Sequence, residues 1–247
     1  MKEVYLAYFD FMGFKEFIQN NDDESLMNRM GHIFRDIEIC LGQGKYQQSR
    51  NGIIIADLSN SKLNCLNISD TVIMWTNKCD LDSLKELINV AYEFNWREIG
   101  YNFPLRGVIL KGKIREVTKK QNNLKGGTYS VQCVYGKGIV DAHLKAESQN
   151  WAGTIIDQTI INDLIIFEQI DFINKIATKY NVPYKHEYKK EYVFKFTKTP
   201  LSDALLIDAL NSIDIVFSQD NKSVEKKSIK MKIKNTKKFI IDTKDEE

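Results

Sequence analysis

The chain has 247 residues, of which 43% are hydrophobic and 28% charged, so it can build one sizeable core. Thirty-five Lys and Arg against 33 Asp and Glu leave a net charge of +2, and there are only three prolines, so neither dedicated nucleic-acid binding nor disorder is favoured. No stretch approaches the roughly 20 apolar residues of a membrane helix, and no export signal opens the sequence. We therefore expect a cytoplasmic globular protein with no membrane or nucleic-acid partner.

The spacing of cysteines and histidines indicates neither a zinc site nor a disulfide framework. These residues are scattered along the chain, at Cys40, Cys65, Cys79, Cys133, His32, His143 and His186. No G-x-S-x-G motif of a nucleophilic hydrolase is present either, so hydrolysis by a Ser or Cys nucleophile is not favoured.

The first elements predict a buried strand that delivers an acid to the start of a helix. Residues 4–9 are β-branched and aromatic, Asp10 ends the run, and Gly13 precedes the apolar residues of a helix over 14–18. A second, longer helix is expected over 25–41, after acidic capping residues.

A hairpin with an acid at its tip is expected next. Residues 53–55, 63–68 and 71–75 have the composition of strands, and only Ser69 and Asp70 separate the last two.

The middle of the chain predicts a helix from about residue 82 to the high 90s, because Ser83 and Glu86 have the spacing of a capping box. A strand over 105–114 and a polar, flexible loop over 119–127 follow.

A strand over 131–135, a helix over 138–149 and a strand near 154–156 complete the order β-α-α-β-β-α-β-β-α-β for the first 157 residues. This order predicts an α+β, ferredoxin-like fold with a mostly antiparallel sheet flanked by helices.

The remainder predicts C-terminal additions to one continuous domain over residues 1–247, whose core spans about 1–157. Expected elements are helices around 158–180, a strand over 192–196, a helix over 202–217 and a lysine-rich final helix. Residues 222–238 hold eight lysines and one acid, Glu225, so this helix is either an anion-binding face or an ordinary solvated surface.

Asp10 and Asp70 are the strongest candidates for chemistry. Neighbouring strands lie about 5 Å apart, so a hairpin beside the first strand can bring the two carboxylates together, in a donor set suited to Mg²⁺ with a phosphorylated substrate. The turn at Phe11, Met12, Gly13 and Phe14 opens a helix and offers backbone N–H groups to a triphosphate. Each aspartate alone also has a structural interpretation, as a cap or a turn residue.

A second group of candidates lies on the helix over 138–149. Asp141, Lys145 and Ser148 share one face, with a surface ion pair between the first two as the alternative to a functional role. Ile139, Val140, His143 and Leu144 form the opposite, apolar face, which we expect to pack into the core. Lys137, just before this helix, is a candidate for reaching a phosphate.

Taken together, these segments resemble the class III nucleotide cyclase catalytic domain, and most of all the bacterial Pycsar antiphage cyclases, which make cyclic pyrimidine mononucleotides. The resemblance rests on Tyr8-Phe-Asp-Phe-Met-Gly-Phe14, Ile68-Ser-Asp-Thr-Val72, Arg106-Gly-Val-Ile-Leu-Lys-Gly112 and Tyr135-Gly-Lys-Gly-Ile-Val-Asp-Ala-His-Leu-Lys-Ala-Glu147. The order and spacing of these motifs together carry the resemblance.

The resemblance implies a homodimer with active sites at the subunit interface. Asp10 and Asp70 would bind two Mg²⁺ or Mn²⁺ ions, with help from the Phe11 carbonyl. The partner chain would supply Asp141 and Lys145, where the family commonly carries Asn and Arg, and this departure puts the rate and the choice of substrate in question.

The implied reaction converts a nucleoside triphosphate, with UTP as the best match, into the 3′,5′-cyclic mononucleotide and pyrophosphate. The product would act as a second messenger for antiviral defence through a downstream effector. CTP, ATP and GTP stay open as substrates, and so does a catalytically silent cyclase-like module that binds nucleotides or dimerises. A diguanylate cyclase is weakened because the hairpin lacks the Gly-Gly-acidic-acidic-Phe signature.

Overall fold

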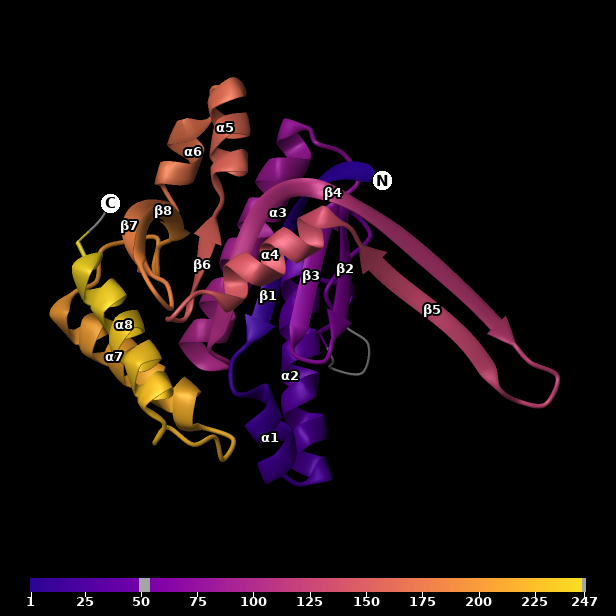
Figure 1. The fold of residues 1–247 in the computed structure, drawn as a ribbon, viewed down its shortest axis with the longest axis horizontal. Coiled ribbons are helices and arrows are strands. Elements are labelled where there is room, and N and C mark those ends of the chain that lie inside the picture. Colours follow the sequence, from indigo (N-terminus) through magenta and orange to yellow (C-terminus); the bar gives the residue numbers. More distant parts are fainter. Residues whose placement is uncertain (49–53, 246–247) are drawn as a thin grey trace.

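The computed structural model describes residues 1–48 and 54–245 and contains one eight-stranded sheet (Figure 1). Its strands lie in the order β2-β3-β1-β4-β6-β8-β7, and β5 pairs with β4 beyond the sheet. The strand pairs are antiparallel apart from β4 with β6. The strands are β1 Lys2–Phe11, β2 Leu63–Ile68, β3 Thr71–Thr76, β4 Leu105–Asn122, β5 Thr128–Tyr135, β6 Gly153–Ile156, β7 Ala177–Pro183 and β8 Tyr188–Phe194. The helices are α1 Phe14–Asn20, α2 Asp23–Gly42, α3 Leu81–Tyr101, α4 Lys137–Glu147, α5 Gln158–Ile166, α6 Ile170–Asn174, α7 Asp203–Ser218 and α8 Lys227–Asp242.

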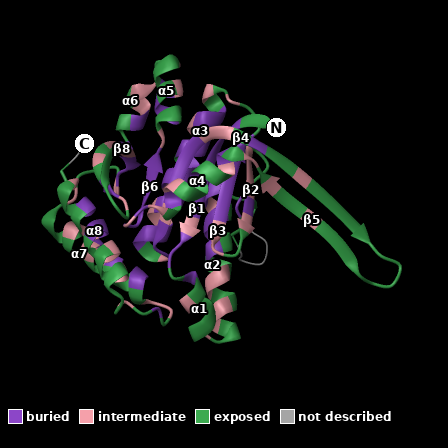
Figure 2. Ribbon diagram, in the orientation of Figure 1, coloured by how far each residue is buried: buried purple, intermediate pink, exposed green. Residues whose placement is uncertain are grey.

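The central strand β1 is buried on both faces, which is why it reads as a continuous apolar run. Tyr5, Ala7 and Phe9 face the larger core under α3, whereas Leu6 and Tyr8 face a smaller core under α4. Figure 2 shows this buried centre in purple and the far part of the β4–β5 hairpin in green. The larger core also includes side chains of α7 and α8, such as Phe217 and Ile240.

The α+β class, the mostly antiparallel sheet and the order of the first ten elements are as predicted. The expectation of a polar loop over 119–127 is wrong, because β4 continues to Asn122 and a short turn leads directly into β5. Both faces of this ribbon are exposed, so its strands carry polar residues that give no alternation of apolar and polar positions. The Asn123 amide donates to the Gly127 carbonyl at 2.7 Å and closes the turn.

Three further expectations differ from the structure. The residues after α6 form the strand β7 rather than a helix. Asp80, not Ser83, caps α3, by accepting a hydrogen bond from the Ser83 amide at 2.8 Å. Glu86 accepts instead from the Lys62 amide, so it is unavailable for the capping box.

The strand expected over 53–55 begins at a residue outside the described part of the chain. Ile54 and Ile55 lie in no strand, and next to them only an isolated bridge joins Tyr46 and Ala56. Among the described helices, none is both long and apolar enough to cross a bilayer.

The C-terminal helices α7 and α8 lie side by side at one end of the sheet (Figure 1). α8 is anchored to the loop between α4 and β6: Asn235 donates to the Asn150 carbonyl, and Thr236 accepts from the Ala152 amide, both at 2.8 Å. The Phe239 ring packs edge-on against Trp151 in the same loop. These contacts place the lysine-rich helix beside the C-terminal end of α4.

Candidate active site

Asp10 lies at the end of β1, on the side of the sheet covered by α4. Its cross-strand neighbours are Thr71 on β3 and Arg106 on β4. Tyr8, two residues earlier on the same face, hydrogen-bonds His143 of α4 at 3.0 Å. The aspartate is therefore held between two strands and under the last turns of α4.

Asp70 is brought to the same place by the β2–β3 turn. Its backbone carbonyl accepts a hydrogen bond from the Phe11 amide at 2.8 Å, which ties the turn to the end of β1. Thr71, the residue after Asp70, is the cross-strand neighbour of Asp10, so the two aspartates lie at the same edge of the sheet. The predicted convergence of two strand-end acids is thus present in the structure.

Arg106 lies in one of the motifs that carry the resemblance, but the sequence analysis assigned it no role. It is directly bound to Asp10. Its Nε donates to Oδ2 of Asp10 at 3.0 Å, and a second guanidinium nitrogen contacts the same oxygen. Its remaining nitrogen donates to the Glu147 carbonyl at the end of α4. Burial raises the pKa of Asp10, and the Arg106 guanidinium opposes that rise.

The turn over residues 11–14 can contact a substrate only through its backbone. The side chains of Phe11, Met12 and Phe14 are all buried in the core. Gly13 has φ of 83°, in the left-handed region, and directs the chain into α1, whose first amides have no partner within the helix. The Phe11 and Met12 amides already donate to the Asp70 and Pro104 carbonyls, so an anion would have to use the N–H groups from Gly13 onward.

The donor set fits a divalent ion that arrives with a phosphorylated ligand. No group of three His, Cys, Asp or Glu side chains that could enclose a metal occurs in the described ranges, 1–48 and 54–245. Mg²⁺ commonly uses one or two carboxylates and completes its shell with substrate phosphates and water. That requirement is met by Asp10, Asp70 and the Phe11 carbonyl, provided that Arg106 gives up some or all of its hydrogen bonds to the Asp10 carboxylate.

Asp141 and Lys145 lie in a different place within the same chain. Both line a cavity of about 650 Å³ between α4 and the Tyr184–Glu191 segment. Lys145 does not pair with Asp141 but with Asp157 at 2.7 Å and Glu191 at 3.1 Å. Within the described part of the chain neither residue forms an ion pair with Asp10, Asp70 or Arg106, and a role beside the two aspartates is expected of a partner chain only from the resemblance.

Lys137 also lies far from Asp10 in one chain. It begins α4, where Gly138 packs on Gly112 of β4. Gly112 pairs with Val4 of β1, six residues before Asp10, which amounts to roughly 20 Å along the strand. A contact between Lys137 and a ligand at Asp10 would also need a second chain.

The expectation that Val140, His143 and Leu144 pack into the core is wrong. Val140 is 53% and Leu144 57% exposed, and His143 is also exposed. The buried face of α4 is made instead by Gly138, Ala142 and Ala146. These small residues let the helix approach the sheet closely, so its larger apolar side chains point outward.

Solved structures with a similar arrangement are nucleotide cyclase domains. The guanylate cyclase domain of RhGC from Catenaria anguillulae, in complex with GTP, gives a TM-score of 0.50 at 12% identity, over 78% of this chain and 96% of that one. The dimeric guanylyl cyclase domain of RhoGC from Blastocladiella emersonii gives 0.51 at 12% identity, with the same coverage. A rhodopsin-guanylyl cyclase core with converted specificity, in complex with ATPαS, gives 0.50 at 11% identity, over 78% of this chain and 95% of that one.

This chain has the class III cyclase fold. No family model matches the sequence, and the search of curated proteins finds no match. At 12% identity or less the likeness establishes the architecture, and the chemistry has to be argued from the residues at the end of β1.

Proposed function

We propose that the protein is a nucleotidyl cyclase that converts a nucleoside triphosphate into its 3′,5′-cyclic monophosphate and pyrophosphate. The observation that carries the proposal is the convergence of Asp10 and Asp70 beside the turn over 11–14, within this fold. In the reaction the ribose 3′-oxygen forms a bond to the α-phosphorus and loses its proton, while the bond to the β-phosphate oxygen breaks and pyrophosphate departs.

Each part of the site has a task in this scheme. Asp10, Asp70 and the Phe11 carbonyl would hold two Mg²⁺ or Mn²⁺ ions, which would activate the 3′-oxygen and neutralise charge on the leaving group. The backbone amides after Gly13 would orient the triphosphate. Arg106, already bound to Asp10, is placed to bind phosphate oxygens once a ligand competes for it.

The base is proposed to be uracil, on the resemblance to the Pycsar cyclases alone, with CTP, ATP and GTP as alternatives. Among the similar structures are domains bound to GTP and to ATPαS, and neither ligand decides the base here. The product would then be a second messenger in antiviral defence, acting through a downstream effector.

A homodimer with shared sites belongs to the same proposal. It would bring Asp141, Lys145 and Lys137 of one chain to the aspartates of the other. The exposed apolar side chains of Val140 and Leu144 offer a surface that association would cover.

A catalytically silent nucleotide-binding module is the second candidate, and the ion pairs of Lys145 favour it. A lysine held by Asp157 and Glu191 must leave both to stabilise a transition state. It is also a weaker partner for a phosphate than the arginine common in the family.

The decisive test incubates the purified protein with Mn²⁺ and, separately, ATP, GTP, CTP and UTP, with products identified by chromatography and mass detection. We expect a 3′,5′-cyclic mononucleotide from one of the four, and none from Asp10→Asn or Asp70→Asn variants that keep the native circular dichroism spectrum. A folded wild-type dimer that yields no cyclic product from any triphosphate would support the silent module. Full activity in either variant would refute the metal assignment.

A further inference from the structure

Lys232 lies on the face of α8 that is anchored beside the candidate active site. Asn235 and Thr236, three and four residues later and hence on the same side of the helix, bind the loop residues Asn150 and Ala152. Lys232 therefore faces the region where that loop leaves the end of α4.

Two other cations converge on the same region. Arg106 donates to the Glu147 carbonyl and to Asp10, and the Lys185 amide donates to the Ser148 carbonyl. The Lys185 ammonium group binds the Glu147 carboxylate at 3.1 Å, so its charge also lies at this end of α4. Burial and the two neighbouring cations lower the pKa of Lys232, and Asp10 opposes them.

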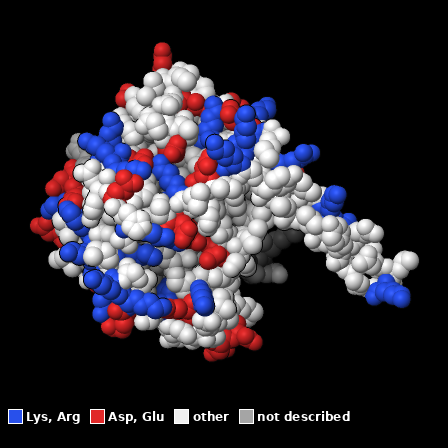
Figure 3. Space-filling view, in the orientation of Figure 1, with Lys and Arg blue, Asp and Glu red and all other residues white. Residues whose placement is uncertain are grey.

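The other lysines along α8 show what is unusual about Lys232. Lys230, Lys237 and Lys238 pair with Glu225, Asp214 and Asp242, respectively. Figure 3 shows the same mixture of basic and acidic side chains over the end of the molecule formed by α7 and α8. Within the described part of the chain, Lys232 is half-buried and has no carboxylate at ion-pair distance.

A half-buried ammonium group beside two further cations is unfavourable in the free protein. Asp10 is already bound by Arg106, and the ion pair of Lys185 with Glu147 is exposed to solvent. An anion bound between these groups would offset the unfavourable burial and mutual repulsion of their positive charges. The anion would in turn be stabilised by charge-assisted hydrogen bonds from cations whose positions are fixed.

We propose that Lys232, together with Arg106 and Lys185, forms a polyphosphate-binding site next to Asp10, so that the C-terminal helix supplies a phosphate ligand to the active site of its own chain. This inference rests on the proposed function for the identity of the anion as the triphosphate of the substrate.

The surrounding residues favour a short polyphosphate over a nucleic acid. Asp10 and Asp70 repel a bare phosphate backbone but accept an anion that carries a divalent cation. A nucleic-acid surface would also need a row of free cations, whereas three of the six lysines of α8 are paired with acids of the same chain.

The test is isothermal titration of the full-length protein with inorganic tripolyphosphate in the presence of Mg²⁺. We expect Lys232→Gln to weaken binding by about tenfold, as for loss of one charge-assisted phosphate contact, and Lys232→Arg to restore most of it. Lys234→Gln is the matched control, because Lys234 is exposed on the same helix, and it should bind like the wild type. Without ligand, Lys232→Gln should melt at the wild-type temperature or above it.

Three results would overturn the inference: no tripolyphosphate binding by the wild type, equal binding by Lys232→Gln, or a lower melting temperature of unliganded Lys232→Gln. The cyclase assay, run on the same samples, separates this inference from the proposed function. Cyclic product formed by Lys232→Gln with a wild-type KM would refute the role of Lys232 and leave the cyclase in place. If the wild type makes no cyclic product but still binds tripolyphosphate, and Lys232→Gln weakens that binding, the binding site stands and the cyclase proposal is refuted.

Discussion

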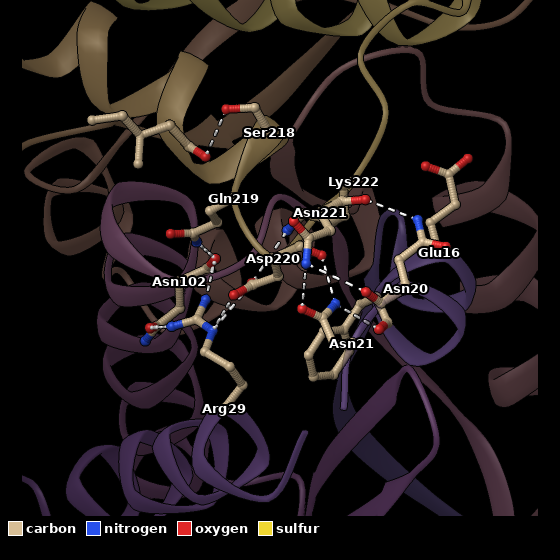
Figure 4. A network of polar contacts seen from close by, with 12 residues as sticks. Glu16, Asn20, Asn21, Arg29, Asn102, Ser218, Gln219, Asp220, Asn221 and Lys222 are labelled. Carbon is tan, nitrogen blue, oxygen red and sulfur yellow. Dashed lines mark hydrogen bonds and ion pairs between the residues drawn. The ribbon is translucent and has the colours of Figure 1, made fainter. Parts of the chain in front are cut away.

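At the scale of single residues, the most unusual group is the buried lysine that covers the turn over 11–14. The Lys222 side chain is 2% exposed, and its ammonium nitrogen lies 3.8 Å from Asp220 and 4.1 Å from the centre of the Phe103 ring. Asp220 itself is bound by Arg29 at 3.0 Å, within the polar network of Figure 4. The stem of Lys222 packs directly on Gly13. Burial lowers the pKa of Lys222 to about 8, so protonation of this lysine is less favourable in the folded protein than in the unfolded chain.

This cost predicts a pH dependence of stability. Between about pH 8 and the ordinary pKa of 10.5, the unfolded chain holds a proton at Lys222 that the folded protein has lost, so stability rises with pH in this window. The slope from this group is at most about 1.4 kcal/mol per pH unit. Other groups oppose it, such as Cys65, whose pKa burial raises to about 12.

The measurement is therefore the difference in urea-unfolding free energy between wild type and Lys222→Met at pH 7.5, 8.5 and 9.5. We expect the unfolding free energy of the wild type to increase relative to that of the variant as the pH rises. A difference that stays constant across the three pH values would show that Lys222 titrates normally.

At the scale of elements, the approach of α4 to β4 decides which face of the helix is free. A Cβ at Gly112 would lie 2.7 Å from the Gly138 Cα, so two glycines are needed where helix and strand meet. The helix is held close by its small residues and presents Val140 and Leu144 to the outside. Close packing and an exposed apolar face are thus two results of one arrangement.

Gly112→Ala should consequently destabilise the protein, by about 1–3 kcal/mol, because the backbone of α4 has to move to admit the methyl group. Gly31→Ala is the matched control: Gly31 lies in α2, and a Cβ added there would meet nothing within 4 Å, so alanine should stabilise the helix by about 0.5–1 kcal/mol. Chemical denaturation of both variants measures the two effects. Equal stability of Gly112→Ala and the wild type would contradict the close contact.

At the scale of the whole molecule, one chain holds two separate groups of candidate residues. Asp10 and Asp70 lie at the end of β1, whereas Asp141 and Lys145 line the cavity beside β8. The proposed homodimer predicts that a complete site forms between two chains.

Complementation tests that arrangement. Asp70→Ala and Lys145→Ala chains should each be inactive alone, and an equal mixture, after subunit exchange, should recover about a quarter of wild-type activity, since half the dimers are mixed and each has one intact site. Mixing two Asp70→Ala preparations is the control. No recovery in mixed dimers, verified by native mass spectrometry, would exclude sites shared in this way.

The sequence alone determined the elements whose signals are local. The apolar run of β1, the acid at its end, the Asp70 hairpin and the order of the first ten elements follow from strand composition, turn residues and helical periodicity. The convergence of Asp10 and Asp70 was also predictable, because strand adjacency implies it.

The partners of these residues and the exposed faces of the helices depend on how the elements pack together. Arg106 pairs with Asp10 through the register of two strands about a hundred residues apart, and α8, near the C-terminus, is anchored to the loop that follows α4. Which face of α4 is exposed depends on the contact between Gly112 and Gly138. Helical periodicity cannot predict this, because a face of large apolar residues and a face of small residues can both be buried. Long-range register and close backbone packing are properties of the assembled fold, so no local pattern in the sequence specifies them.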